Sequence, residues 1–191
     1  MKFYSLEYWP VHVICAGMIA AAVIDWWKFK VPNKLTFPLV FTGWALGLAN
    51  NFGLGACEDG VSAGIGSALV GTLVGLGLML PIYIIGGMGA GDVKLLAGVG
   101  AWVWGTVTLY AFCASAVIGG LIAVAMVLYR KAWEKHRDQF WMIWNEMVTI
   151  RDAEQLSVIA AERKSSMLLL PYGIPIALGT IAYFAWNGML L

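Results

Sequence analysis

The chain has 191 residues, of which 61% are hydrophobic and only 12% are charged, and its formal net charge is +1. Soluble domains are nearer half apolar and a quarter charged, so this composition predicts an integral membrane protein and excludes an ordinary soluble domain. A nucleic-acid-binding protein would carry a basic patch, for which a charge so close to zero gives no support. The length accommodates about six membrane spans of roughly 20 residues each, with their loops.

The cysteines give no support for a metal site or a cofactor. Cys15, Cys57 and Cys113 are scattered and form no CxxC pair, which leaves zinc and iron–sulfur sites without a basis. Cys15 and Cys113 lie in apolar runs, where cysteine commonly serves as a small packing residue. We therefore predict that the protein holds no metal and no cofactor.

Six apolar runs follow one another along the chain and predict an all-α polytopic membrane protein with a six-helix transmembrane bundle. They cover about residues 9–27, 35–50, 61–85, 93–103, 106–129 and 167–190. A cleaved signal peptide is disfavoured for the first run, because Lys2 alone forms its basic region and Glu7 follows. The fourth run is short for a span, so we expect it to be tilted or partly shielded by an aromatic girdle of Trp102 and Trp104.

Small residues recur along the third run at a spacing close to four. They are Gly60, Gly64, Ala68, Gly71 and Gly75. Such a stripe lets neighbouring helices approach closely in lipid, where association depends on packing. We expect this helix to pack tightly against another one along the stripe.

Residues 130–166 form the only long polar stretch, which we interpret as an insert in a single membrane-embedded domain covering residues 1–191. Its large apolar residues recur at spacings of three, four and seven, a pattern typical of an amphipathic helix on the inner leaflet. We favour simple interfacial anchoring over docking of a partner protein. The residues in this pattern are Trp133, Phe140, Trp141, Trp144, Met147 and Val148.

The basic residues predict the orientation in the membrane. Six spans with both termini outside place every lysine and arginine except Lys2 on the inner side. Cytoplasmic loops carry an excess of these residues, so this asymmetry supports both the span count and the direction. The insert at 130–166 is then cytoplasmic.

Two aspartates fall at the inner edge of predicted spans. Asp25 ends the first run, and Asp92 begins the fourth, directly after Gly89, Ala90 and Gly91. An acid in or beside a membrane span is costly and is a functional-site hypothesis by default. Two carboxylates that meet in a low-dielectric site share one proton, so that one can deprotonate water while the other protonates a carbonyl oxygen. Such a pair hydrolyses a peptide bond by general acid–base catalysis.

Other interpretations stay open at this point. Asp92 is a suitable N-cap for the fourth helix, and Asp25 is close enough in the predicted topology to pair with Lys28 or Lys94. The protein would then be a non-catalytic membrane subunit. A small proton- or cation-coupled transporter is also compatible with a helix start broken by glycines, although no inverted repeat is visible.

Three blocks of the sequence resemble a known family. Gly89-Ala90-Gly91-Asp92 matches the GxGD signature of intramembrane aspartyl proteases, and residues 87–96 followed by Gly100-Ala101-Trp102 resemble bacterial type IV prepilin peptidases. The segments Val31-Pro32-Asn33-Lys34-Leu35-Thr36 and Pro171-Tyr172-Gly173-Ile174-Pro175 are similar to two further blocks of that family.

The resemblance implies that Asp25 and Asp92 are the catalytic pair. Its motifs add supporting residues, namely Pro32, Asn33, Gly89, Gly91, Lys94, Pro171 and Gly173. The implied partners are the lipid bilayer and a prepilin or pseudopilin, whose short basic leader is cut at the cytoplasmic face of the bacterial or archaeal cytoplasmic membrane. Paired CxxC motifs of bifunctional members are missing, so we expect no methyltransferase activity, as in compact peptidases of tight-adherence pili or archaeal preflagellins.

Overall fold

The computed structural model describes residues 9–53, 64–84, 87–129, 138, 141, 142, 145, 149 and 171–190, and no strand is assigned among them. Six helices follow in chain order: α1 (Trp9–Lys28), α2 (Asn33–Asn51), α3 (Ile65–Ile84), α4 (Ala90–Trp102), α5 (Gly105–Tyr129) and α8 (Gly173–Trp186). Each corresponds to one predicted apolar run, so the all-α prediction is confirmed. Most of the predicted amphipathic insert, including Trp133, Phe140, Trp144, Met147 and Val148, lies outside the described residues.

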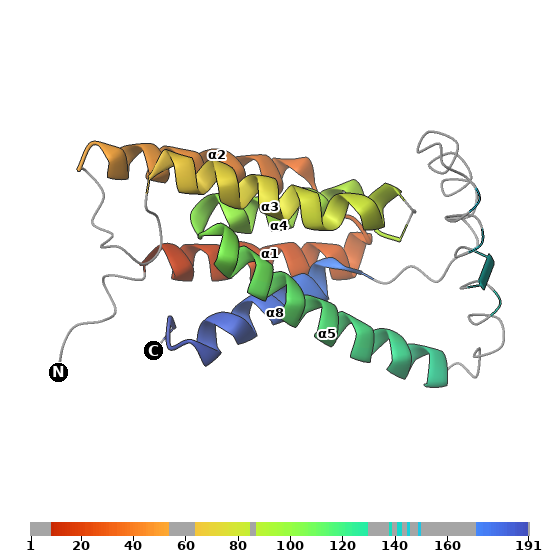
Figure 1. The fold of residues 1–191 in the computed structure, drawn as a ribbon. Coiled ribbons are helices and arrows are strands. Elements are labelled where there is room, and N and C mark those ends of the chain that lie inside the picture. The colour runs from red at the N-terminus through yellow and green to blue at the C-terminus, as the bar shows by residue number, and fades with distance from the viewer. Residues whose placement is uncertain are drawn as a thin grey trace.

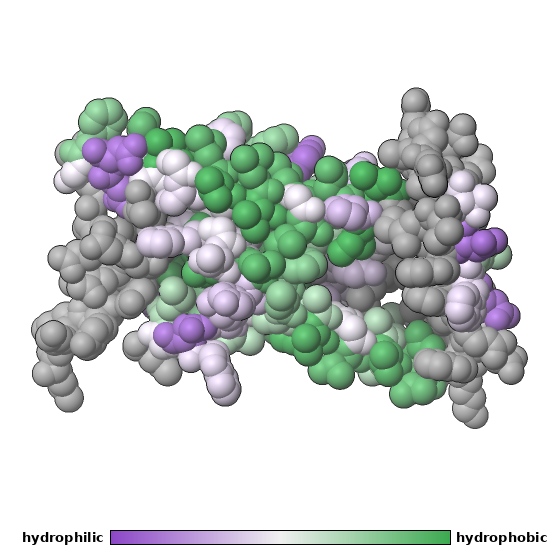
Figure 2. All heavy atoms as spheres, in the orientation of Figure 1, coloured by the Kyte–Doolittle hydropathy of each residue, from purple (hydrophilic) through white to green (hydrophobic). Residues whose placement is uncertain are grey.

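Large apolar side chains cover much of the surface. Leu73 on α3 and Leu121 on α5 are 67% and 66% exposed, and Figure 2 shows a hydrophobic belt across the middle of the molecule with hydrophilic residues toward its two ends. Water would disfavour so extensive an apolar surface, whereas lipid accommodates it. Helices α1, α3 and α5 are long and apolar enough to cross a membrane. The structure therefore supports a membrane protein, and six spans remain a prediction.

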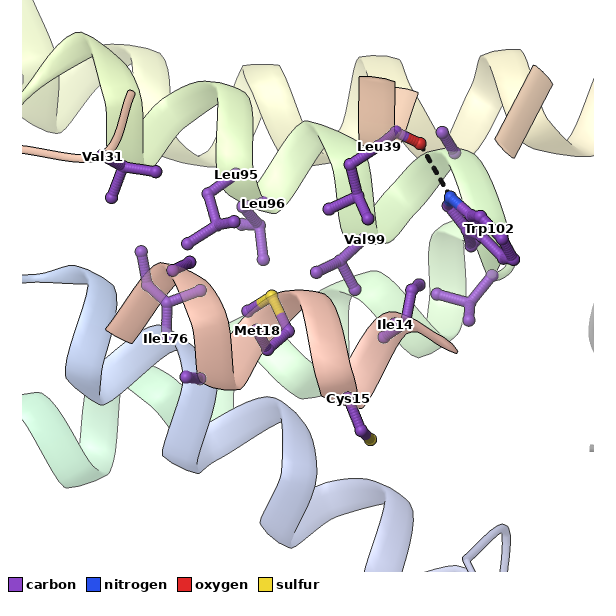
Figure 3. Packing of buried hydrophobic residues seen from close by; sticks show 14 of the residues in the cluster. Ile14, Cys15, Met18, Val31, Leu39, Leu95, Leu96, Val99, Trp102 and Ile176 are labelled. Atoms are coloured by element: carbon purple, nitrogen blue, oxygen red, sulfur yellow. Dashed lines mark hydrogen bonds between the residues drawn. The ribbon is translucent and has the colours of Figure 1, made fainter. Parts of the chain in front are cut away.

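Helix α4 is the centre of the bundle. Ten of its 13 residues are buried, and α1, α2 and α3 pack around it. Trp102 is only 5% exposed, and its Nε1–H donates a hydrogen bond to the carbonyl oxygen of Leu39 at 2.7 Å (Figure 3). The expectation that Trp102 belongs to an aromatic girdle is therefore wrong. Protein helices shield α4, so it does not need the length of a lipid-exposed span.

Glycines let the neighbouring backbones approach α4. A Cβ added at Gly75 of α3 would lie 2.7 Å from the carbonyl oxygen of Leu96, and one at Gly43 of α2 would lie 2.8 Å from the carbonyl carbon of Ala101. Gly71 and Gly100 lie against each other's backbone at the same crossing. The predicted close packing of the third helix is thus confirmed at Gly71 and Gly75.

The packing contacts also fix the helix directions. Gly71 meets Gly100 and Gly75 meets Leu96, so α3 runs antiparallel to α4, whereas Gly91 meets Val31 and Gly98 meets Leu39, so α2 runs parallel to it. The end of α1 and the starts of α2, α4 and α8 consequently gather at one end of the bundle, on the right in Figure 1. We call this the acid end, because it holds both predicted catalytic aspartates.

The two α3 glycines at positions 75 and 77 allow a direct test of the packing. We expect Gly75→Ala to destabilise the protein by about 1–3 kcal/mol, because the new methyl group meets backbone atoms that cannot move aside. Gly77→Ala should leave stability unchanged or slightly raised, since nothing lies within 4 Å of its added Cβ. Thermal unfolding in nanodiscs measures the stability of both variants. Equal stabilities of the two variants would contradict the α3–α4 packing.

Candidate active site

Asp25 lies in the last turns of α1 and is 3% exposed. Its Oδ2 atom accepts a hydrogen bond from the backbone N–H of Gly173 at 2.7 Å. Gly173 is the first residue of α8, and the first N–H groups of a helix have no acceptor within the helix. A Cβ at position 173 would stand 2.9 Å from Asp25 Oδ2, so a glycine is required for this approach.

Asp92 is the third residue of α4 and is 6% exposed. Its Oδ2 atom accepts the backbone N–H of Gly89 at 3.0 Å, and its own N–H donates to the carbonyl oxygen of Gly89 at 3.2 Å. Gly89 is thus the N-cap, and the suggestion that Asp92 is the N-cap is wrong by three positions. The Asp92 carboxylate reaches back over the first turn of its own helix, as the acid of a capping box does.

The turn before α8 contacts Asp25 and lies within electrostatic range of Asp92. Gly173 donates its N–H to Asp25, and its neighbour Tyr172 is close enough for the negative charge on Asp92 to act on its phenol. Burial raises the pKa of Tyr172, and the charge on Asp92 raises it further. The two carboxylates, which are far apart in sequence, therefore both act on one turn of the chain. Tyr172 was not among the predicted site residues, although it stands inside the block at residues 171–175.

The turn between α1 and α2 packs on the start of α4. A Cβ at Gly91 would lie 2.6 Å from the carbonyl oxygen of Val31, which itself is buried. Pro32 precedes α2, and its carbonyl oxygen accepts the N–H of Leu35 at 3.0 Å. Gly91 therefore lets this turn approach the start of α4 next to Asp92.

The remaining predicted residues surround this centre. Lys94 donates a hydrogen bond from Nζ to Asn33 Oδ1 at 3.0 Å. Among the described residues it forms no ion pair with Asp25, so the suggested pair of Asp25 with Lys94 is wrong. Lys28 is exposed while Asp25 is buried, and no ion pair between them occurs in the described part of the chain. Pro171 precedes α8, and its carbonyl oxygen accepts the N–H of Ile174 at 3.2 Å.

The chemistry available here is that of a carboxylate pair. Buried carboxylates that approach each other cannot both ionise easily, and such a pair favours a state in which one proton is shared. The backbone N–H that each acid accepts holds its carboxylate in place. Among residues with described positions, no group of three or more His, Cys, Asp or Glu side chains is arranged to hold a metal ion.

The chain is similar in sequence to a family of known proteins. The profile of the type IV leader peptidase family matches residues 12–124, which include both aspartates. A prepilin leader peptidase/N-methyltransferase of Aeromonas hydrophila is 28% identical over 120 residues, which cover 59% of this chain and 38% of that protein. Proteins with the same name from Pseudomonas aeruginosa and Escherichia coli (strain K12) are 32% identical over 123 residues and 28% identical over 141 residues.

These matches cover only part of the relatives. The Pseudomonas match covers 61% of this chain and 39% of that protein, and the Escherichia match covers 70% and 58%. The chain thus spans about two fifths of the length of the Aeromonas and Pseudomonas relatives. No solved structure matches the chain significantly.

The two carboxylate contacts predict a crossed pattern of amide exchange. We expect Asp25→Ala to accelerate hydrogen exchange at Gly173 N–H by roughly 10- to 100-fold, because a buried N–H loses its charged acceptor. By the same reasoning, Asp92→Ala should accelerate exchange at Gly89 and leave Gly173 protected. Exchange measured by NMR in nanodiscs tests both variants, each serving as the control of the other. Unchanged exchange at Gly173 in Asp25→Ala would contradict the contact.

Proposed function

Because this chain belongs to the type IV leader peptidase family, we propose that it is an aspartyl endopeptidase that removes the short basic leader of prepilin-like proteins. The observation that supports the mechanism best is the turn at Tyr172 and Gly173, which contacts Asp25 and lies within electrostatic range of Asp92. The relatives named as prepilin leader peptidases support the substrate class.

In the proposed reaction the carboxylate pair activates a water molecule. One aspartate, ionised, takes a proton from the water as its oxygen bonds to the carbonyl carbon of the scissile peptide. The other, protonated, gives its proton to the carbonyl oxygen. Collapse of the tetrahedral intermediate then breaks the C–N bond, and the amine leaves with a proton returned from the pair. The titration belongs to Asp25 and Asp92 together.

The acid end supports cleavage at the cytoplasmic face of the membrane. Lys28 at the end of α1, Lys34 near the start of α2 and Lys94 on α4 all lie at this end. Basic residues favour the cytoplasmic side. A substrate whose apolar helix lies in the bilayer against the hydrophobic belt would present the bond before that helix at the depth of the two acids. The bilayer is then a partner in orienting the substrate.

Substitution of either aspartate by asparagine tests the mechanism. Asparagine keeps the shape of the side chain and an oxygen that can accept the same N–H, so the fold should survive. We expect Asp25→Asn and Asp92→Asn each to lower the cleavage rate of a prepilin in nanodiscs by at least roughly 10²- to 10⁴-fold, the usual contribution of general acid–base catalysis. Asp59→Asn, at a position outside the described residues, is the matched control and should cleave normally. Normal cleavage by either dyad variant would exclude the proposed mechanism, and ion flux without cleavage would favour a transporter.

The orientation of the protein in the membrane can be tested separately, at the two ends of α2. In a cysteine-free background, Lys34→Cys should react with a membrane-impermeant maleimide only when the cytoplasmic face is accessible. Phe52→Cys, just beyond the other end of the helix, should react only from the opposite face. Labelling of both positions from one side would contradict the proposed topology.

A further inference from the structure

Lys94 and Asn33 lie in two separate sequence blocks, one at the start of α4 and the other at the start of α2. The structure brings the two side chains together, with Lys94 Nζ 3.0 Å from Asn33 Oδ1. The same ammonium group stands over the ring of Phe37 on α2, 4.7 Å from the ring centre. A single lysine of α4 is thus held by two side chains of the first turns of α2.

This contact lies beside a second one between the same two segments. Gly91, three residues before Lys94, packs on the backbone of Val31, two residues before Asn33. Asp92 stands between Gly91 and Lys94 in the first turn of α4. Residues two apart on a helix do not share a face, so Lys94 engages α2 while Asp92 faces a different direction.

We propose that Lys94 is a positioning residue that holds the first turn of α4, and with it Asp92, against the segment that follows Asp25. We call the contacts of Lys94 with Asn33 and Phe37 the α2–α4 clamp. Asn33 comes eight residues after Asp25, across the turn between α1 and α2, so the clamp ties α4, which carries Asp92, to the helix that directly follows the one carrying Asp25. The inference rests on the proposed function.

The clamp affects the reaction rate by keeping the Asp92 carboxylate in its position. Displacement of a catalytic group by about 1 Å can lower a rate by roughly 100-fold, even when the substitution lies away from the chemistry. Because the Lys94 ammonium is engaged by Asn33 and Phe37, it acts through Asp92 and takes no part in proton transfer. A lysine that contacted the substrate would instead change KM and its dependence on leader charge.

Four variants in nanodiscs test the clamp with a prepilin substrate. We expect Lys94→Met to lower kcat by about 10- to 100-fold with KM within about twofold, and Lys94→Arg to retain most of kcat, since arginine keeps a cationic donor. Asn33→Ala should lower kcat less, and the double variant Lys94→Met/Asn33→Ala should be no slower than Lys94→Met alone, as expected for residues that act through one contact. The matched control is Lys34→Met, which removes the same charge next to Asn33 and should leave kcat unchanged.

Hydrogen exchange supplies a measurement that does not need activity. Lys94→Met should accelerate exchange of the amides at residues 89–94 and leave those of α8 unchanged, whereas Lys34→Met should change neither. Three results would each contradict the proposed positioning role of Lys94. They are a selective rise in KM, additive effects of the Lys94 and Asn33 substitutions on kcat, and unchanged exchange at residues 89–94. If wild-type protein cleaves no prepilin but the exchange pattern holds, the proposed function fails while the clamp stands as a structural contact.

Discussion

The site depends on the hydrogen bond that Gly173 N–H donates to Asp25 Oδ2, which joins residues 148 positions apart. Asp25 lies near the carboxyl-terminal end of α1, where the partial negative charge of the helix disfavours an ionised acid. The amino-terminal end of α8 carries the opposite partial charge and an N–H without an acceptor in its own helix. The contact between the start of α8 and Asp25 therefore stabilises the acid at the end of α1 and also gives the Gly173 N–H an acceptor.

Asp92 is stabilised in a different way, because it lies at the amino-terminal end of its own helix and accepts the N–H of Gly89. The two acids also lie on helices whose most extensive contacts are with different partners. Asp25 is on α1, which packs on α8, and α8 packs on α5 through Gly179 and Ser115. Asp92 is on α4, which packs on α2 and α3. The relative position of the acids is set by the buried core between α1 and α4 and by the contact of Val31 with Gly91.

Local patterns sufficed to predict the helices and the residues of the acid end. Glycines before Asp92 and a proline after Asp25 mark helix ends in the sequence itself, and α1 and α5 begin and end within a residue or two of their apolar runs. The burial of α4 was not predictable, because hydropathy does not distinguish a helix that faces lipid from one that faces other helices. Asp92 was wrongly suggested as the N-cap of α4. The N-cap depends on the residue at which the helix begins, and α4 begins two residues before Asp92.

The partners of the acids could not be predicted either. Nothing in the spacing of Asp25 and Gly173 indicates that they meet, since their contact follows from the packing of α8 on α1. The contact between Lys94 and Asn33 has the same origin, as it requires α2 to run parallel to α4. Residue types pointed to the chemistry of the site, whereas only the helix packing identified which side chains hold it in place.

In a lipid bilayer, these polar contacts also stabilise the packing of the helices. Lipid tails are as apolar as the helix surfaces, so helices in a bilayer associate through close packing and polar contacts between them. The bundle has few such polar contacts among its described residues. One joins Trp44 to Thr72 at 3.0 Å, and another joins Ser115 to the carbonyl oxygen of Ile176 at 3.3 Å. The bonds from Gly173 to Asp25 and from Lys94 to Asn33 belong to the same class, because each joins two helices. The contact that holds the Asp25 carboxylate and the contact between Lys94 and Asn33 therefore both help to hold the bundle together at the acid end.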